Sequence, residues 1–331
     1  MSANPQTEAG TRPALAILVL NYGTAELVED CLGTLAHAVD GARRCVLVID
    51  NASPDDSAAR IADAIGRHGW GGWARLILAG RNDGFSAGNN LGINAVEADA
   101  YLLLNSDTLV RAGAIDRLED AVRAHRGLAA ARLEWPDGSA QPNLRRWATP
   151  LGELARAART APLSRALGRT SSSVAHLPTL PRDSWASGAC LAIHRDVIER
   201  IGLLDEGFFL YFEDMDYCRR ALEAGLPLVW VEDARVVHLK GGTSSVAALT
   251  RARARRPDFY YAARARYLAK HHGRVGLLLA NLAFQLGQLV AWGRETFGGK
   301  QPHLCEREAA DSWRHLRYPL APWRPGTNGP R

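Results

Sequence analysis

Four short, almost wholly apolar runs mark the first third of this 331-residue chain. They are LAILVL (15–20), CVLVID (45–50), RLILAG (75–80) and AYLLLN (100–105), and segments of helical character separate them. Continuous apolar runs of this length are typical of strands that are buried on both faces, as in a parallel sheet. The alternation of such runs with helices predicts an α/β domain with a Rossmann-like, mostly parallel sheet flanked by helices.

Polar residues follow each of the four runs. In doubly wound sheets ligands bind beyond the carboxyl ends of the strands, so these residues are candidates for a site. They are Asn21 and Tyr22, Asp50 to Ser53, Arg81 to Phe85, and Asn105 to Asp107. Asn, Asp and Gly also make ordinary turns, but four polar tips in succession favour a ligand site at this edge.

Two common nucleotide motifs are absent from the sequence. No GxGxxG follows the first run, and no GxxxxGK[ST] occurs, so a dinucleotide site or a P-loop has little support. Gly84, Gly88 and Gly92 recur every four residues instead. We interpret them as glycines that let a loop and the start of a helix approach a ligand closely.

Composition favours a globular protein with reduced thiols. Hydrophobic residues make up 47% of the chain and charged residues 23%, which is enough for one large domain or two smaller ones. The five cysteines show no CxxC pair and no zinc-like spacing, as in a cytosolic protein. Residues 1–13 carry no basic stretch, so we expect a disordered N-terminus before a first strand rather than a signal peptide.

Three acids, Glu213, Asp214 and Asp216, lie within four positions directly after the aromatic-rich residues 208–212. Apolar surroundings and a neighbouring like charge both raise the pKa of a carboxyl group, which suits a general base. Asp216 is expected to form a helical ion pair with Arg220, four residues later. A solvated helix start would also favour acids through the helix dipole, but it would not explain the preceding aromatic residues.

Several blocks of the sequence resemble, in order, those of a family 2 glycosyltransferase of GT-A fold, in its rhamnosyltransferase-like branch. These blocks are VLNYGTAELVEDCLGTL, VIDNASPDDS, RNDGFSAGNNLGI, LLLNSDT, GACLAIHRDVIERIGLLDEGFFLYFEDMDYCRRALEAG and VVHLKGGTS. The resemblance implies a glycosyltransferase domain over residues 14–245.

The resemblance also implies a nucleotide-sugar site at the strand ends. Asp50 would accept a hydrogen bond from the imide N–H of a uracil or thymine ring. The other residues expected to line the nucleotide or its diphosphate are Asn21, Asn51, Asn82, Gly84, Phe85, Gly88, Asn89, Asn105 and Ser106.

A divalent cation, Mg²⁺ or Mn²⁺, is implied by the NSD segment, which stands where the family has its DXD motif. Asp107, the last acid of the motif, would bind a cation that bridges the two phosphates of the donor. His238 would be a further ligand, although a lone histidine after a strand is also commonly structural. Asn105 replaces the first acid of the motif, which is expected to weaken metal binding.

Inverting sugar transfer needs a base that takes the proton of the acceptor hydroxyl. The family's base is the Asp of its ED pair, which corresponds to Asp214 here, with Glu213 as its acidic neighbour. Trp185, in WASGAC, would either offer an apolar face to a pyranose ring or belong to the core.

The C-terminal third combines a basic stretch with an apolar one. Residues 251–274 hold eight Arg or Lys against one acid and lead into the apolar segment 275–292. Asn281, Gln285 and Gln288 interrupt that segment at helical spacing, which favours a helix lying in a membrane interface over one crossing it. The basic stretch is expected to attract anionic lipid headgroups and lipid-linked diphosphate. Nucleic-acid binding is the rival interpretation, and the apolar helix would have no use in it.

We therefore expect residues 246–300 to be a helical membrane-associating region and 301–331 an irregular tail. The Arg-, Ala-, Ser- and Pro-rich stretch 138–181 is expected to be a mobile insertion, with an amphipathic helix, that covers the acceptor or touches the membrane.

These expectations combine into a metal-dependent inverting glycosyltransferase of cell-envelope glycan synthesis, cytoplasmic and peripheral to the inner face of the membrane. The expected donor is dTDP-L-rhamnose, and the expected acceptor is a saccharide carried on a polyprenyl diphosphate or another polysaccharide precursor. Donors such as UDP-GlcNAc, UDP-galactose or UDP-galactofuranose stay open. So does a catalytically silent nucleotide- or glycan-binding relative, which the asparagine of NSD would favour.

Overall fold

The computed structural model describes residues 12–166, 180–239, 246–299 and 301–326. Its first four long strands lie on the four predicted runs. They are β1 (Leu15–Asn21), β2 (Arg44–Asp50), β3 (Ala74–Leu78) and β4 (Ala100–Asn105). These strands are parallel, in the order β3-β2-β1-β4. The predicted Rossmann-like half of the sheet is thus confirmed.

The second half of the sheet is mixed. The eight strands have the order β3-β2-β1-β4-β9-β6-β10-β5. The added strands are β5 (Thr108–Val110), β6 (Leu128–Glu134), β9 (Cys190–His194) and β10 (Leu228–His238). Strand β9 is antiparallel to β4 and β6, whereas β10 is parallel to β6. A separate short ribbon pairs β7 (Leu144–Arg146) with β8 (Ser184–Ala186).

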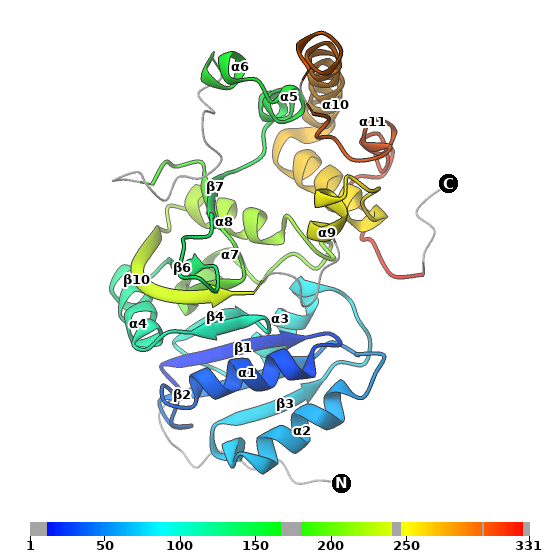
Figure 1. Ribbon diagram of the computed structural model, residues 1–331. Helices are drawn as coiled ribbons and strands as arrows, with labels where there is room; N and C mark the ends of the chain where they lie inside the picture. The colour runs from blue at the N-terminus through cyan, green and yellow to red at the C-terminus, as the bar shows by residue number, and fades with distance from the viewer. Residues whose placement is uncertain (1–11, 167–179, 240–245, 300, 327–331) are drawn as a thin grey trace.

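Helices cover both faces of the sheet, as Figure 1 shows. Along β1, Leu15 and Ile17 pack toward α1, α2 and α4, whereas Ala16 and Leu18 pack toward α3, α7 and α8. This alternation follows from the period of two residues along a strand. The bounds are α1 (Ala25–Leu35), α2 (Ser57–Arg67), α3 (Phe85–Asn94), α4 (Ala114–His125), α7 (Arg195–Ile201) and α8 (Glu213–Glu223).

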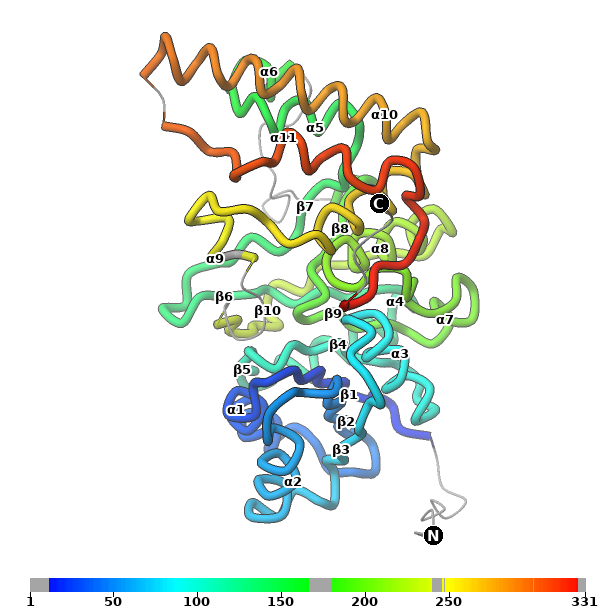
Figure 2. The backbone as a smooth tube through the Cα atoms, turned by 90° about the vertical axis from the view of Figure 1, so that its right-hand side faces the viewer, coloured from blue at the N-terminus to red at the C-terminus, as the bar shows by residue number. Residues whose placement is uncertain are grey.

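A helical layer lies beyond the sheet and its flanking helices. It consists of α5 (Pro150–Ala158), α6 (Ala161–Ala166), α9 (Val246–Arg251), α10 (Asp258–Gly298) and α11 (Glu308–Asp311). Figure 2 shows α5 and α10 at the end of the molecule opposite α2 and β3. Helix α10 bends at Gly273, whose backbone is non-helical (φ 70°, ψ 175°). The bend falls where the basic stretch meets the apolar segment.

The stretch expected to be an insertion, 138–181, is described as far as residue 166 and again from residue 180. It contains β7, α5 and α6, so the expected helix is present and its buried face packs on α10. A Cβ on Gly287 of α10 would lie 2.6 Å from the carbonyl oxygen of Leu154 and 2.7 Å from Cβ of Ala157. The glycine therefore sets the close approach of the two helices. Movement of this stretch over an acceptor stays a prediction.

A buried guanidinium joins the helices of this layer. Arg264, only 2% exposed, donates to Oε2 of Glu153 on α5 at 2.7 and 2.9 Å and to Oδ1 of Asn281 at 2.8 Å. Burial raises the pKa of Glu153, but the charges of Arg156 and Arg264 outweigh burial and lower it to about 2. The pair therefore stabilises the fold above the ordinary pKa of Glu, and this contribution is lost as the pH falls toward 2.

The polar side of the apolar segment faces inward, which corrects the predicted reason for membrane association. Asn281 is fully buried on Arg264, and Gln285 donates to the carbonyl of Ala309 at 2.9 Å and to Oγ of Ser312 at 3.1 Å. These polar groups satisfy partners inside the protein and do not form a water-facing side. The face of α10 that remains outside is apolar.

Most of the basic stretch also faces inward. Five of its eight basic side chains form ion pairs with carboxylates of other segments: Arg255 with Asp311, Arg256 with Glu308, Arg264 with Glu153, Arg266 with Asp205, and Lys270 with Asp205 and Asp216. The predicted attraction to anionic lipid therefore loses much of its basis, because these charges are already balanced within the protein.

Replacement of Glu153 by glutamine tests the buried junction. We expect Glu153→Gln to lower the free energy of unfolding by about 3 kcal/mol, because Arg264 would keep its charge in a buried place without a counterion. The control is Glu232→Gln, whose exposed pair with Arg132 should contribute almost nothing. Denaturant titration at pH 7 measures both, and equal stabilities of the two variants would contradict the assignment.

Candidate functional site

The carboxyl ends of β1, β2 and β4 meet at one edge of the sheet. The register pairs Asn21 with Asp50, and Leu20 with Asn105. The amide nitrogen of Asn21 donates to Oδ1 of Asp50 at 2.7 Å, and the hydroxyl of Ser53 donates to the same oxygen at 2.5 Å. The structure thus places three of the polar tips together, as the sequence predicted.

Thr24 extends this network to the NSD segment. Its hydroxyl and its backbone N–H both donate to Oδ1 of Asn21, at 2.9 and 3.0 Å. The same hydroxyl lies 3.1 Å from Oγ of Ser106. Because Asn21, Asp50 and Ser106 are all buried, this network holds the three strand ends in a fixed arrangement.

A second group of polar side chains closes the loop before α3. The amide nitrogen of Asn51 donates to Oδ1 of Asn82 at 2.9 Å and to the carbonyl oxygen of Gly84 at 3.2 Å. Gly84 has a φ of 95°, and a Cβ on it would lie 2.1 Å from the carbonyl oxygen of Phe209. The N–H of Phe85 donates to that carbonyl at 2.7 Å. The loop is therefore locked to the segment that precedes the acidic cluster.

The remaining glycines of this segment have a packing role, and their expected approach to a ligand stays a prediction. A Cβ on Gly88 would lie 2.4 Å from Cδ1 of Leu20, and one on Gly92 would lie 2.9 Å from Cδ1 of Ile49. Both glycines let α3 lie close against the sheet. Asn89 is buried too, and its side chain donates to the carbonyl of Phe85 at 2.9 Å.

Asp107 and His238 form a buried pair at the same edge of the sheet. Nε2 of His238 lies 3.3 Å from Oδ1 of Asp107. Strand β10 brings the histidine there, since His238 is paired with Thr108 of β5. Two residues that are 131 positions apart in the sequence thus meet as the resemblance implied.

The hydrogen bonds of Gln141 determine which ring nitrogen of His238 carries the proton when the ring is neutral. The amide nitrogen of Gln141 donates to the carbonyls of His238 and Glu134, at 2.7 and 3.4 Å, so its Oε1 faces Nδ1 of His238 at 3.1 Å. Nδ1 must then carry the proton, and in the neutral ring Nε2 presents its lone pair to Asp107. Two facing acceptors need a proton or a cation between them, so the pair fits a divalent metal.

This pair supplies two donors of the kinds that Mg²⁺ and Mn²⁺ accept, a carboxylate oxygen and an imidazole nitrogen. Within residues 12–166, 180–239, 246–299 and 301–326, no group of three or more His, Cys, Asp or Glu side chains is placed to hold a metal. A cation here would therefore take its other ligands from water and from a bound diphosphate. Asn105 is half-buried beside the pair, and its N–H donates to the carbonyl of Ala189 at 3.0 Å.

The three acids of α8 have different surroundings. Asp216 is fully buried and contacts Nε of Arg220 at 2.9 Å, Nζ of Lys270 at 2.9 Å and Nε2 of His271 at 2.7 Å. Burial raises its pKa, but the His271 hydrogen bond and the charges of Arg220 and Lys270 bring it below the ordinary value. The predicted ion pair with Arg220 is confirmed, and α10 adds two further cations.

Glu213 and Asp214 have no such counterion within ion-pair distance in the described part of the chain. Asp214 is held by hydrogen bonds, which its Oδ2 accepts from the N–H of Gly188 at 3.2 Å and its Oδ1 from the N–H of Met215 at 2.8 Å. Burial raises the pKa of Asp214 to about 6. Burial and the adjacent charge of Asp214 raise the pKa of Glu213 well above its ordinary value.

The aromatic residues before α8 account for this burial. Phe212 packs on Tyr260 and Tyr267, and Tyr211 on Phe259 and Tyr260, all on α10. Tyr211 and Phe212 both have positive φ, 72° and 67°. Such consecutive left-handed residues cost free energy and are held in place by the packing around them, as is common at functional sites.

Gly188 connects the base candidate to the strand ends. A Cβ on it would lie 3.4 Å from the ring of Phe85 and 3.5 Å from Cβ of Asp214. Trp185, three residues earlier, is half-buried between two core clusters, and its indole N–H donates to the carbonyl of Arg146 at 3.1 Å. The structure therefore supports its role in the core, and a stacked sugar stays a prediction.

Sequence reasoning missed several residues that arrange this site. Thr24 and Ser53 join the strand ends, Gln141 orients His238, and Gly188 bonds Asp214. Oδ1 of Asn90 accepts from the N–H of Leu204 at 3.1 Å, and the amide nitrogen of Asn90 donates to the carbonyl of Leu204 at 2.9 Å. Ser53 lay within a polar tip that the pattern singled out, whereas no local pattern points to Gln141, whose partner is 97 residues away.

The sequence model of "Glycosyltransferase like family 2" matches residues 13–257 of this chain. An N-acetylglucosaminyl-diphospho-decaprenol L-rhamnosyltransferase of Mycobacterium tuberculosis is 28% identical over 285 residues, which are 81% of this chain and 84% of that protein. The low-salt glycan biosynthesis hexosyltransferase Agl10 of Haloferax volcanii is 24% identical over 237 residues, 68% of this chain and 66% of that protein.

Solved structures show the same fold. The mannosyltransferase PcManGT of Pyrobaculum calidifontis, in complex with GDP-Man and Mn²⁺, matches with a TM-score of 0.53 at 15% identity, over 88% of this chain and 78% of that one. TarS of S. aureus in complex with UDP matches with a TM-score of 0.52 at 13% identity, over 86% of this chain and 72% of that one. The predicted GT-A fold is confirmed.

The raised pKa of Asp214 predicts a gain in stability when the charge is removed. Its folded-state pKa lies above the ordinary value, so the carboxyl group favours the fold when protonated and loses that contribution as the pH rises through about 6. We expect Asp214→Asn to raise the free energy of unfolding at pH 7.5 by about 2 kcal/mol and to change it little near pH 3, below the ordinary pKa of Asp. Thermal unfolding at the two pH values measures this, and a variant less stable at pH 7.5 would contradict it.

Proposed function

The chain belongs to the family described as glycosyltransferase-like family 2, and we propose that it transfers L-rhamnose from dTDP-L-rhamnose to a saccharide carried on a polyprenyl diphosphate. The reaction is a glycosyl transfer with inversion. The mycobacterial relative named above, which acts on a decaprenol-linked acceptor, supports this choice of sugar and acceptor. Another relative is named only as a hexosyltransferase, so the donor sugar stays open. UDP-linked sugars are the second candidate donors, because TarS, which shares the fold, was solved in complex with UDP.

The donor nucleotide would lie across the carboxyl ends of β1, β2 and β4. Asp50 is 4% exposed there, and its carboxylate is oriented by Asn21 and Ser53, so it could accept one hydrogen bond from a pyrimidine imide. Asn51 and Asn82 hold the loop before α3, which would cover the pyrimidine ring of the donor nucleotide. The buried network keeps these acceptors oriented before the donor arrives.

Asp107 and His238 would hold the divalent cation, Mg²⁺ or Mn²⁺. The imidazole nitrogen and the carboxylate oxygen lie 3.3 Å apart and both residues are buried, which supports this assignment. Such a cation, when bound, neutralises charge on the diphosphate that leaves. PcManGT was solved with GDP-Man and Mn²⁺, which is consistent with a cation here.

Asp214 would act as the general base. In the transfer, the acceptor oxygen forms a bond to the anomeric carbon while the bond from that carbon to the nucleotide diphosphate breaks. The proton of the acceptor hydroxyl passes to Asp214, and the nucleotide diphosphate takes the electron pair of the broken bond. A carboxylate with a pKa of about 6 is mostly ionised at neutral pH and is a stronger base than an ordinary aspartate. The carboxylate of Asp214, held beside the strand ends by Gly188 and without a counterion within ion-pair distance among the described residues, is the observation that carries the proposal.

Removal of the base tests this function. We expect Asp214→Asn to lower the rate of transfer by roughly 10² to 10⁴ and to leave donor affinity nearly unchanged, because the base faces the acceptor. In the wild type, kcat/KM should rise with pH through about 6 as the carboxyl ionises. Release of dTDP or UDP from a panel of donors, in the presence of lipid-linked acceptor and Mn²⁺, measures both.

Glu213→Gln is the matched comparison and should have the smaller effect. A dead Glu213→Gln variant alongside an active Asp214→Asn variant would move the base to Glu213. Absence of turnover with every donor and acceptor would favour the silent nucleotide- or glycan-binding relative.

A membrane surface is the proposed location of the reaction. Among the described residues, α10 is the one helix long and apolar enough to cross a bilayer by length and composition, and its apolar window is 39% buried in the protein. The apolar face is the set of exposed side chains after the bend: Val275, Leu278, Leu279, Leu282, Leu286, Leu289, Val290, Trp292 and Phe297. They recur at helical spacing on one side, so the helix could lie with this face in the lipid while its other side stays on α5 and α11.

Charge on the apolar face should release the protein from lipid. We expect Leu286→Glu/Leu289→Glu to weaken binding to vesicles of neutral phosphatidylcholine by about tenfold or more, since both side chains are more than half exposed and would enter the lipid. The control is Leu91→Glu, an exposed leucine on α3. Vesicle co-sedimentation measures all three proteins, and undiminished binding of the double variant would exclude this face.

A further inference from the structure

A cavity outside the strand-end site is lined by arginine. It has a volume of about 790 Å³ and lies between α5, α6, the start of α10 and the tail after residue 300. The basic residues that line it are Arg145, Arg156, Arg159, Arg165, Arg256 and His303, and Glu308 is its one acidic lining residue. This volume is within the range of small-molecule sites, about 300–1,000 Å³.

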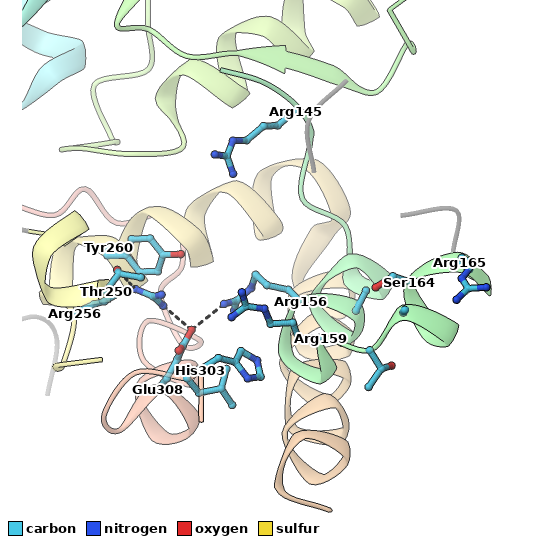
Figure 3. Close-up of a pocket in the computed structure, with 14 residues that line it drawn as sticks. Arg145, Arg156, Arg159, Ser164, Arg165, Thr250, Arg256, Tyr260, His303 and Glu308 are labelled. Atoms are coloured by element: carbon cyan, nitrogen blue, oxygen red, sulfur yellow. Dashed lines mark hydrogen bonds and ion pairs between the residues drawn. The ribbon is translucent and has the colours of Figure 1, made fainter. Parts of the chain in front are cut away.

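Two of these arginines are structural. Figure 3 shows Arg156 and Arg256 meeting at Glu308, whose Oε1 lies 2.8 and 2.6 Å from them. Within the described residues, no carboxylate is within ion-pair distance of Arg145, Arg159 or Arg165. The cavity therefore has a net positive charge that the protein itself leaves unbalanced, in the form of guanidinium groups that suit phosphate oxygens.

One end of the cavity is close to the proposed base. Arg145 lies opposite Trp185 in the β7–β8 ribbon, and its charge acts on the carboxylate of Asp214, lowering a pKa that burial raises. In Figure 3 it stands apart from the other arginines, nearer to the sheet. An anion bound in the cavity would thus have one end directed toward the place where an acceptor hydroxyl must lie.

The other end of the cavity is lined by α5, which packs on the helix that carries the apolar face. Arg159 is the C-cap of α5, and α5 is packed on α10 at Gly287, which lies in the sequence between the exposed Leu286 and Leu289. His303, on the tail, approaches the same end of α5 with Nε2 3.0 Å from the carbonyl of Ala157. The residues that line the cavity therefore reach from α5, which packs on the proposed lipid-facing helix, to Arg145, whose charge acts on the proposed base.

We infer that this arginine-lined cavity binds the diphosphate of the polyprenyl-diphosphate-linked acceptor. The inference rests on the proposed function. A lipid-linked acceptor has an apolar chain, a diphosphate and a sugar in that order, and the molecule presents an apolar face, a basic cavity and a base in the same order. The donor diphosphate has its own place at Asp107 and His238, on elements that do not line this cavity.

Binding of a short soluble polyprenyl diphosphate tests this assignment without requiring turnover. Titration calorimetry of the full chain with farnesyl diphosphate, in the absence of donor and metal, should detect binding. Arg159→Gln/Arg165→Gln removes two exposed arginines of the cavity and should weaken that binding by about tenfold or more. Arg145→Gln should weaken it as well. Arg117→Gln/Arg123→Gln, two exposed arginines on α4, removes the same charge elsewhere and should leave it unchanged.

The possible outcomes distinguish three sources of the bound phosphate: the acceptor, the donor and a phospholipid headgroup. The affinity for dTDP with Mn²⁺ should be equal in wild type and variants, and its loss in the cavity variants would overturn the assignment in favour of the donor. Weaker binding of the variants to phosphatidylserine vesicles, with farnesyl diphosphate binding intact, would overturn it in favour of a phospholipid headgroup. No binding of farnesyl diphosphate to the wild type would also overturn it. Selective loss of binding in the cavity variants, in a protein that transfers no sugar, would support the cavity and refute the proposed function.

Discussion

The placement of charge at the start of α8 is the constraint on which the rest of the arrangement depends. Three acids within four residues cannot all be buried as anions without compensation, because each would lose its hydration. Asp216 receives Arg220, Lys270 and His271, and stays ionised in the interior. Glu213 and Asp214 receive no such partner among the described residues, so their pKa values rise. Asp216, held by these partners, thereby fixes the turn of α8 that also carries Glu213 and Asp214.

Helix α10 has a different role on each side. Its inner side supplies the cations for Asp216 and Asp205, the aromatic rings that bury the start of α8, and Arg264, which joins α5 to the tail. Its outer side, after the bend at Gly273, exposes apolar residues. One helix thus connects the proposed lipid surface to α8, which carries the proposed base, through direct contacts. A rigid connection of this kind would fix the depth at which a lipid-linked acceptor meets the base.

The local sequence pattern was sufficient to predict the Rossmann-like half of the sheet and to show the family resemblance. It was insufficient where the interacting residues are distant in the sequence. The four apolar runs became β1 to β4 because a strand buried on both faces needs little more than continuous apolar side chains. The Asp216–Arg220 pair could be predicted, because four residues are one helical turn. By contrast, the spacing of Gly88 and Gly92 did not show that they lie against Leu20 and Ile49 of the sheet. Helical spacing identified a polar side at Asn281 and Gln285 but could not show that it points inward.

The sequence by itself determined the strand–helix alternation, the polar tips at the strand ends and the crowding of acids after an aromatic run. These features depend on neighbours within a few residues, where the backbone periodicities of strand and helix apply. Only the tertiary structure decided which acid receives cationic partners, which nitrogen of His238 faces Asp107, and which carboxylates the basic stretch pairs with. Each of those outcomes depends on a side chain between 52 and 131 positions away. The free energy of a buried charge is set by what surrounds it in space, and the order of residues along the chain does not specify those surroundings.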